Sequence, residues 1–195
     1  MSHMNLSRVV NWVDTINKLP SLSYLGLDRC ELHWIPPSLP FVDFTSLEVL
    51  KLGFNYFNPF IPLWLANISS LSDLHMTGNQ FQGSIPDAFG NMTSLTALYL
   101  DFNKLEGGIP KTLGNLCNLK KLGLSSNKLG VEISAIFENL SGCTADSLQY
   151  LYLRKNQLHG HLPDLRKMSS LVHLFLSENR LTGSIPESLG QLSQL

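Results

Sequence analysis

LTALYLDFNKLEGGIP, residues 95–110, is the stretch that decides the fold, because its pattern of leucines and one asparagine returns along the chain about every 24 residues. A fixed period of this length is typical of a stack of similar small units and not of a globule built around one centre. Leucines in equivalent places open seven units and a truncated eighth at Leu22, Leu47, Leu71, Leu95, Leu119, Leu148, Leu171 and Leu195. We therefore predict an α/β repeat solenoid over residues 19–195.

Each unit is expected to begin with a short strand. In residues 95–101 the apolar residues end in an alternating pattern, which indicates a strand that buries Leu98 and Leu100 and turns Ala97, Tyr99 and Asp101 to solvent. Neighbouring strands bury their leucines against each other only when the units stack at roughly 4.7–4.9 Å. The prediction is a parallel sheet that lines the concave side of a curved horseshoe or superhelix.

The second half of each unit is expected to form the outer wall. After the turn at Gly107–Pro110, Leu113 and Leu116 stand at helical spacing. Proline sets an extended or turning backbone, and glycine allows conformations that other residues resist. We expect a short helical or 3-10 turn in this place.

One asparagine recurs at the bend that follows each strand. Its side-chain amide both donates and accepts, so it can satisfy backbone groups that a tight bend leaves unpaired. Stacked copies would form a structural asparagine ladder at Asn55, Asn79, Asn103, Asn127, Asn156 and Asn179. The first unit has Cys30 there, which we interpret as a buried thiol.

Composition and charge exclude several kinds of function. The 195 residues are 44% hydrophobic and 15% charged, and 14 Lys and Arg stand against 15 Asp and Glu. A net charge of −1 offers no general attraction for nucleic acid. No run of 18 apolar residues predicts a membrane span, and no secretory signal is seen.

No motif indicates catalysis, a cofactor or a metal site. The sequence holds no phosphate-binding glycine loop, no zinc-spaced Cys/His set and no nucleophile motif. The stretch His159-Gly160-His161 could indicate metal binding, but we interpret it as a solvated turn. We predict a protein that is not an enzyme.

The repeat resembles the plant-specific leucine-rich repeat. Residues 79–92, 103–116 and 179–192 match its N-x-L-x-G-x-I-P-x-x-L-G-x-L portion, and residues 83–91 and 113–119 resemble ectodomains of plant receptor-like proteins and receptor-like kinases. The resemblance implies an extracellular ectodomain, secreted or anchored to the plasma membrane through its parent protein. It also implies that this ectodomain binds peptides or proteins.

The two ends depart from a complete ectodomain of this kind. Neither a paired-cysteine N-terminal cap nor a C-terminal cap is present, so we expect an internal fragment of a longer receptor. Residues 1–4 are typical of a remnant left by an expression vector. Residues 5–18 are predicted to be a partial repeat or a short helix that acts as a cap.

The fifth unit breaks the period, since it is 29 residues long. We predict that residues 135–146 form an inserted loop on the outer wall. Cys117 and Cys143 lie in the outer halves of adjacent units, so a disulfide between them is plausible in an oxidising compartment. Two unpaired thiols remain the alternative.

Four N-x-Ser/Thr sequons are candidate glycosylation sites. Two of them share the same place in their units, on the outer side of the solenoid. Their number agrees with extracellular exposure. The four are Asn5, Asn67, Asn91 and Asn139.

Exposed strand positions are the candidate ligand-binding residues. Aromatic and arginine side chains are enriched in binding hot spots, and strand positions that face solvent need not be aromatic for folding. The alternative is that these side chains pack on one another and only stabilise the sheet. The candidates on the concave face are Lys51, Phe54, His75, Tyr99, Asp101, Phe102, Tyr152, Arg154 and Phe175.

Our hypothesis is a non-catalytic ligand-recognition module of a plant cell-surface receptor in immunity or development. It would bind a peptide or protein and would use a co-receptor kinase as partner. The alternative is an extracellular inhibitor of a cell-wall-degrading enzyme that resembles polygalacturonase inhibitors. Ice binding would need a flat array of like residues, and the exposed columns are too mixed for it.

Overall fold

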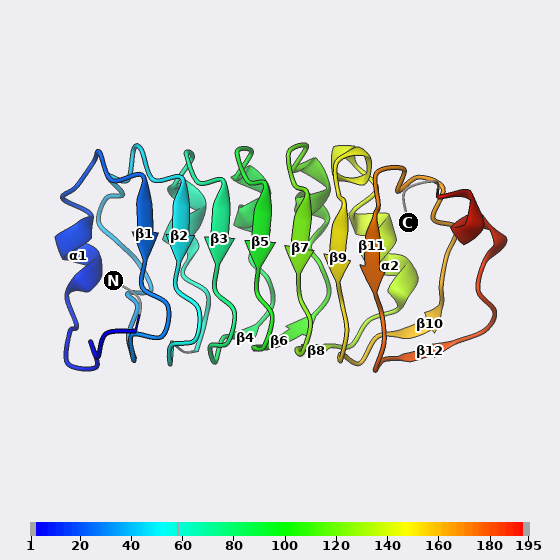
Figure 1. The fold of residues 1–195 in the computed structure, drawn as a ribbon, viewed down its shortest axis with the longest axis horizontal. Helices are drawn as coiled ribbons and strands as arrows, with labels where there is room; N and C mark the ends of the chain where they lie inside the picture. The colour runs from blue at the N-terminus through cyan, green and yellow to red at the C-terminus, as the bar shows by residue number, and fades with distance from the viewer. Residues whose placement is uncertain (1–2, 58, 193–195) are drawn as a thin grey trace.

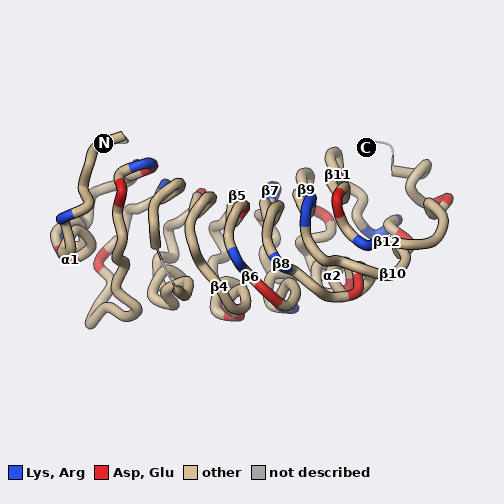
Figure 2. Tube along the Cα trace, turned by 90° about the horizontal axis from the view of Figure 1, so that it is seen from below, with Lys and Arg blue, Asp and Glu red and all other residues tan. Residues whose placement is uncertain are grey.

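A computed structural model describes residues 3–57 and 59–192, which form a solenoid of side-by-side strands with helical turns behind them (Figure 1). The chain advances steadily from one unit to the next, and the sheet lines the inner side of a shallow arc (Figure 2). The predicted repeat solenoid is confirmed. Residues 1–2 of the predicted vector remnant and the predicted eighth opening at Leu195 lie outside the described residues.

The main sheet has seven parallel strands of three residues in the order β1-β2-β3-β5-β7-β9-β11. Their bounds are β1 Tyr24–Gly26, β2 Val49–Lys51, β3 Asp73–His75, β5 Ala97–Tyr99, β7 Lys121–Gly123, β9 Tyr150–Tyr152 and β11 His173–Phe175. The central leucines of all seven strands are in register, so each one packs between its neighbours. This repetition, and not a single centre, builds the core.

The outer wall consists of short 3-10 helices that begin after prolines. They are η1 Leu63–Asn67, η2 Asp87–Asn91, η3 Lys111–Asn115 and η5 Glu187–Gln191. The preceding prolines have extended backbone with φ between −64 and −70°. Proline suits this place because its ring holds φ near the value that the turn needs.

A second set of strands runs along one edge of the solenoid (Figure 1). One group is β4 Gln82–Gly83, β6 Lys104–Gly107 and β8 Lys128–Leu129, and the other is β10 His159–His161 with β12 Arg180–Thr182. Our interpretation of His159-Gly160-His161 as a solvated turn was wrong. This stretch is a strand because the next unit brings residues 180–182 alongside as hydrogen-bonding partners.

The insertion in the fifth unit is helical, so the predicted outer-wall loop was wrong. Helix α2 covers Ile133–Asn139 and is followed by η4, Cys143–Asp146. Ile133, Ile136 and Phe137 are at most 6% exposed. The insertion folds as a helix because this spacing gives it an apolar stripe that it can bury against the unit.

Two contacts fasten the insertion to the preceding unit. Cys117 and Cys143 form a disulfide. The buried Thr144 hydroxyl lies 2.6 Å from the Leu113 carbonyl oxygen and 3.1 Å from that of Leu116. The fifth unit is therefore irregular but firmly attached.

At the N-terminal end, helix α1, Trp12–Ile16, lies within the segment predicted to be a partial repeat or a helix. Trp12 and Val13 are buried, and the Trp12 indole N–H donates to the Trp34 carbonyl at 3.0 Å. The Trp12 ring also lies 6.0 Å from that of Phe57. The helix thus covers part of the first units.

The recurring asparagines connect each unit to the one before it. Asn103 is typical: its Oδ1 accepts from the Phe81 N–H at 3.1 Å, and its Nδ2 donates to the carbonyls of Met76 and Leu100. The same bonds occur at Asn55, Asn79, Asn127, Asn156 and Asn179. Cys30 is buried, and its N–H donates to Asn55 Oδ1 at 3.0 Å.

Candidate ligand-binding face

Four rows of side chains cross the concave face from strand to strand, in the register of the sheet. Row one, immediately before the strand leucine, is Tyr24, Val49, Asp73, Ala97, Lys121, Tyr150 and His173. Row two, immediately after it, is Gly26, Lys51, His75, Tyr99, Gly123, Tyr152 and Phe175.

Rows three and four continue beyond the strand ends. Row three is Asp28, Gly53, Thr77, Asp101, Ser125, Arg154 and Ser177. Row four is Arg29, Phe54, Gly78, Phe102, Ser126, Lys155 and Glu178, all with φ between +53 and +69°. The left-handed conformation costs a residue other than glycine of order 1 kcal/mol or more, so this row carries strain at six of its seven places.

Sequence reasoning missed row one as a source of candidate residues. Strict alternation along each strand would have found it, because residues two apart point to the same face. Ala97, expected to face solvent, lies in this row but is only 6% exposed. Its neighbours in the register of the sheet are Asp73 and Lys121, which have longer side chains.

Four rings at the C-terminal end of the face form a two-by-two group, which we call the aromatic block: Tyr150, Tyr152, His173 and Phe175. Tyr150 stacks on His173 with ring centres 4.8 Å apart, and Tyr152 stacks on Phe175 at 5.0 Å. Within each strand the two rings lie beside each other at 6.4 and 6.1 Å. The block joins two predicted residues, Tyr152 and Phe175, to two that were missed.

Cations of the chain itself cover three of the aromatic rings on this face. Lys121 Nζ lies 5.3 Å from the centre of the Tyr150 ring. Arg29 lies 4.2 Å from that of Phe54, and Lys51 Nζ lies 5.7 Å from that of Tyr24. Such contacts are attractive because the face of an aromatic ring is electronegative.

A second group, nearer the N-terminus, surrounds His75. Its Nε2 lies 2.7 Å from Asp73 Oδ1, a buried atom that makes no hydrogen bond of good geometry, and its ring centre lies 4.4 Å from that of Tyr99. Burial lowers the pKa of His75, the charge of Lys51 lowers it further, and Asp73 opposes both. Burial also raises the pKa of the Tyr99 hydroxyl.

In rows two to four the fifth unit presents only small side chains between these two groups: Gly123, Ser125 and Ser126. The adjacent units place Tyr99, Asp101 and Phe102 on one side, and Tyr152, Arg154 and Lys155 on the other. A hollow of about 430 Å³ lies between residues 101–102 and the residues of the later units, with both serines in its lining. We call this depression the valley. It divides the predicted aromatic stripe into two parts.

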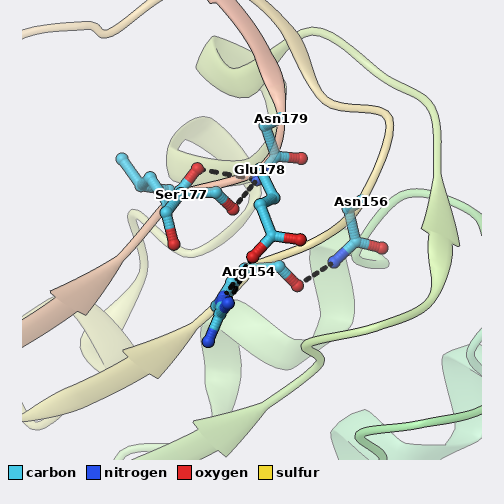
Figure 3. Close-up of polar contacts among 6 residues, drawn as sticks. Arg154, Asn156, Ser177, Glu178 and Asn179 are labelled. Atoms are coloured by element: carbon cyan, nitrogen blue, oxygen red, sulfur yellow. Dashed lines mark hydrogen bonds and ion pairs between the residues drawn. The ribbon is translucent and has the colours of Figure 1, made fainter.

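Two acidic residues border the valley in different ways. Asp101 Oδ1 accepts from the Ser125 N–H at 2.8 Å, and burial raises the pKa of its carboxyl although the hydrogen bonds from Ser125 lower it. Glu178 accepts from the guanidinium of Arg154, with Nε at 2.8 Å, and Figure 3 shows these two side chains turned toward each other. Both partners of this second pair are exposed, so it contributes little to stability.

Phe54 and Phe102 are 46% and 59% exposed in row four, on either side of Gly78. A Cβ atom at residue 78 would lie 2.5 Å from Phe54 Cδ1, so glycine there makes room for the Phe54 ring. Phe102 has only Gly78 and Ser126 beside it in its row.

The sequons differ in exposure. Asn67 and Asn91 are exposed at the ends of η1 and η2 on the outer wall. Asn5 is also exposed, and its Nδ2 donates to Glu31 at 2.9 Å. Asn139 is only half-exposed, because its Nδ2 donates to the Ile109 carbonyl at 2.8 Å.

Charge is sparse and mixed in sign along the solenoid (Figure 2). Within residues 3–57 and 59–192, no three His, Cys, Asp or Glu residues come together as ligands for a metal ion. Over the same part of the chain, no helix is long and apolar enough to span a bilayer.

A family model described as Leucine Rich Repeat matches residues 70–92, 94–116, 118–140, 147–168 and 170–192. No functionally curated protein matches the sequence. The repeat model thus covers most of the chain, including both sides of the valley.

Several solved plant structures are similar. A plant peptide hormone receptor, RGFR1 in complex with RGF2, matches with a TM-score of 0.81 and 31% identity over 92% of this chain. The ectodomain of the Arabidopsis thaliana membrane receptor kinase GASSHO1/SCHENGEN3, in complex with CASPARIAN STRIP INTEGRITY FACTOR 2, has the same score and coverage with 35% identity. The Arabidopsis receptor kinase HAESA, in complex with the peptide hormone IDA and the co-receptor SERK1, matches 92% with a TM-score of 0.69 and 30% identity. This chain spans only 28%, 21% and 34% of their respective lengths.

Proposed function

We propose, on the premise that the chain belongs to the leucine-rich-repeat family, that it is a non-catalytic recognition segment of a plant cell-surface receptor. In this proposal the chain is extracellular and its concave face binds a peptide or protein. The similar structures support it, because they include plant receptors in complex with a peptide hormone. The signal would be passed on by a kinase outside this segment.

The observation that carries the proposal is the aromatic block. Its four rings stand at solvent-facing strand positions, where a repeat needs no aromatic side chain to fold. Rigid aromatic side chains bury large areas at a small cost in conformational entropy, so they are common anchors of interfaces. Phe102 supports the same conclusion, because it keeps a left-handed backbone that glycine would adopt at lower cost.

A co-receptor kinase is the second partner that we propose. HAESA was solved in complex with a peptide hormone and the co-receptor SERK1, and that structure covers 92% of this chain. No feature of the described residues favours the alternative, an inhibitor of a cell-wall-degrading enzyme.

Peptides selected from a displayed library of random 12-residue sequences against the full chain would test the proposal. In the double variant Tyr99→Ala plus Tyr152→Ala, we expect the selected peptides to lose at least about 10-fold in affinity, because two anchors are removed. Leu63→Ala is the matched control, since Leu63 is 61% exposed on the outer wall. Equal affinities of the wild-type chain and the double variant would place the site elsewhere.

We also propose that Asn5, Asn67 and Asn91 carry glycans in the parent protein and that Asn139 does not. Transfer of a glycan needs an accessible amide nitrogen. The Asn139 amide is only half-exposed and donates to the Ile109 carbonyl in a partly buried place, whereas the hydrogen bond of the Asn5 amide lies at the exposed surface. Mass spectrometry of glycopeptides from plant-expressed protein would measure the occupancy. Full occupancy at Asn139 would contradict the proposal.

A further inference from the structure

Rows one and two of the concave face end in the same arrangement of two stacked rings, but the residue before these rings is a lysine in row one and a glycine in row two. Row one ends in Lys121, Tyr150 and His173, and row two ends in Gly123, Tyr152 and Phe175. In row one the ammonium of Lys121 covers the face of the Tyr150 ring. Row two has no side chain in the equivalent place, because that residue is glycine.

The orientation of the rings shows which face of Tyr152 is left uncovered. The planes of Tyr152 and Phe175 differ by 10° and their centres are 5.0 Å apart. Nearly parallel rings this close overlap by their faces, because rings placed edge to edge are kept farther apart by their own width. Phe175 covers the side toward the C-terminus, so the other face of Tyr152 looks across Gly123 into the valley.

Cationic side chains cover several aromatic rings of the concave face. Three rings, those of Tyr24, Phe54 and Tyr150, each have a lysine or arginine of the chain against them. Among the described residues, no cation or second ring lies against the valley side of Tyr152. A cation from a ligand would cover this face of Tyr152 in the same way.

A carboxylate stands on the opposite side of the valley. A Cβ atom on Gly123 would lie 2.2 Å from Asp101 Oδ2 and 2.9 Å from Tyr99 Cδ1, so the Asp101 carboxylate lies directly over this glycine. Asp101 Oδ1 is held by the Ser125 N–H. The carboxylate is therefore fixed in place and partly shielded from water, which strengthens its attraction for a cation.

Among the described charged residues around the valley, Asp101 is a carboxylate that forms no ion pair. Arg154 and Glu178 neutralise each other as an ion pair, and Lys121 lies against Tyr150. Lys155, in row four of the sixth unit, is exposed and lines the same hollow without forming an ion pair with Asp101. The floor beside Asp101 holds only glycine and serine.

We propose that the valley binds the guanidinium group of an arginine side chain of a peptide, which stacks on Tyr152 and pairs with Asp101. The hollow of about 430 Å³, lined by both Asp101 and Tyr152, has room for one such flat group. Guanidinium suits this place better than ammonium, because it is flat, weakly hydrated and pairs with a carboxylate through two N–H groups. This inference rests on the proposed function, since it names the ligand chemistry of the same face.

The test uses the same displayed library of random 12-residue peptides with the full chain. Arginine is expected to be enriched several-fold among peptides selected on the wild-type chain and not among those selected on Asp101→Asn. For the selected peptides made synthetically, replacing arginine by citrulline keeps the shape and removes the charge. We expect this replacement to weaken binding to the wild-type chain about 10-fold or more and to change little on Asp101→Asn.

Matched variants separate the site from general effects on the sheet. Asp28→Asn is the control for Asp101→Asn, because Asp28 Oδ1 accepts from the Gly53 N–H at 2.8 Å in the same row. Tyr24→Leu is the control for Tyr152→Leu, since the Tyr24 ring already has Lys51 against it. We expect about 10-fold losses for Asp101→Asn and Tyr152→Leu, under 2-fold losses for both controls, and retained binding for Tyr152→Phe.

The outcomes distinguish this inference from the proposed function. Peptides that lose affinity on the variant Tyr99→Ala plus Tyr152→Ala but show no arginine enrichment, or no effect of citrulline, would overturn the arginine site and leave the concave face as the binding surface. Peptides that bind this double variant, Asp101→Asn and Tyr152→Leu as tightly as the wild-type chain would overturn both. Enrichment of acidic peptides would also overturn the arginine site.

Discussion

The fourth unit, residues 95–118, and the fifth, residues 119–147, share their buried positions and little else. Leu98 and Leu122 are both fully buried at the centre of their strands, and Asn103 and Asn127 make the same ladder bonds. In rows two to four of the concave face the fourth unit has Tyr99, Asp101 and Phe102, and the fifth has glycine and serine, whereas row one has Ala97 in the fourth unit and Lys121 in the fifth. On the outer wall a five-residue 3-10 helix is replaced by α2 and η4. Stacking therefore constrains the inward positions and leaves the exposed positions free to differ between units.

The largest expected effect concerns a position that the two units share. In Asn127→Ala, the Leu105 N–H and the carbonyls of Leu100 and Leu124 lose their buried partner. We expect a loss of roughly 4 kcal/mol in the free energy of unfolding, since each unsatisfied buried group costs 1–3 kcal/mol. Asn103→Ala should cost about the same in urea denaturation. A much smaller cost in the fifth unit would show that its irregularity relaxes the ladder.

A somewhat smaller effect is expected from the disulfide, which only the fifth unit shares with its neighbour. The bridge between Cys117 and Cys143 closes a loop of 26 residues. Replacing both cysteines by serine should lower the free energy of unfolding by about 3 kcal/mol, because the unfolded chain gains conformational entropy. Reduced wild-type protein is the control and should unfold at the same urea concentration as the variant. No difference between oxidised protein and variant would mean that α2 and η4 hold the insertion without help.

Thr144→Val should have an intermediate effect. The buried hydroxyl lies within hydrogen-bond distance of two carbonyls of the preceding unit, and valine has the same shape without a donor. We expect a loss of about 2 kcal/mol in the free energy of unfolding by urea denaturation. Thr112→Val is the matched control, because the Thr112 hydroxyl donates to the Asp87 carbonyl from an exposed position and should matter less. Equal costs would contradict the idea that the insertion is anchored through Thr144.

The smallest effect is a difference in pH dependence between His75 in the third unit and Asp101 in the fourth. The folded-state pKa of His75 is lowered below 6.5, so the unfolded chain binds more protons and stability should fall as the pH drops below 6.5. The folded-state pKa of Asp101 is raised above 3.8, so the folded chain binds more protons and stability should fall as the pH rises from 3.8. The free energy of unfolding, measured by denaturation at several pH values, checks this. His75→Gln should lose the fall in stability below pH 6.5, and Asp101→Asn should lose the fall above pH 3.8. Slopes of the opposite sign would contradict the assignment.

Much of the scaffold could be predicted because every unit needs it. A leucine column and an asparagine column return in each repeat, so their period is visible even where single units deviate. The inserted helix could also have been found, since Ile133, Ile136, Phe137 and Leu140 have helical spacing. The broken period by itself favours a loop, and this helical spacing of apolar residues is the stronger signal. His159-Gly160-His161 was missed for another reason: a three-residue edge strand exists only through its neighbour.

The candidate site was less predictable. Tyr152 and Phe175 stood out as aromatic residues at exposed positions, but Tyr150 and His173 join them only in the stacked sheet. Gly123 has no side chain that could contact a ligand, so the sequence alone does not indicate it as a site residue. Its importance comes from the two flanking units, which place Tyr152 and Asp101 on either side of it.

By itself the sequence determined the solenoid, its inward leucines, its ladder and the set of positions left free to face solvent, because these follow from periodicity within one chain. Only the tertiary structure decided which of the free positions meet: a lysine over one tyrosine, an uncovered face on the next, and a carboxylate across a gap made by glycine. The physical reason is that residues about 24 apart become neighbours only when parallel strands stack in register. Register and ring orientation are properties of the packed sheet.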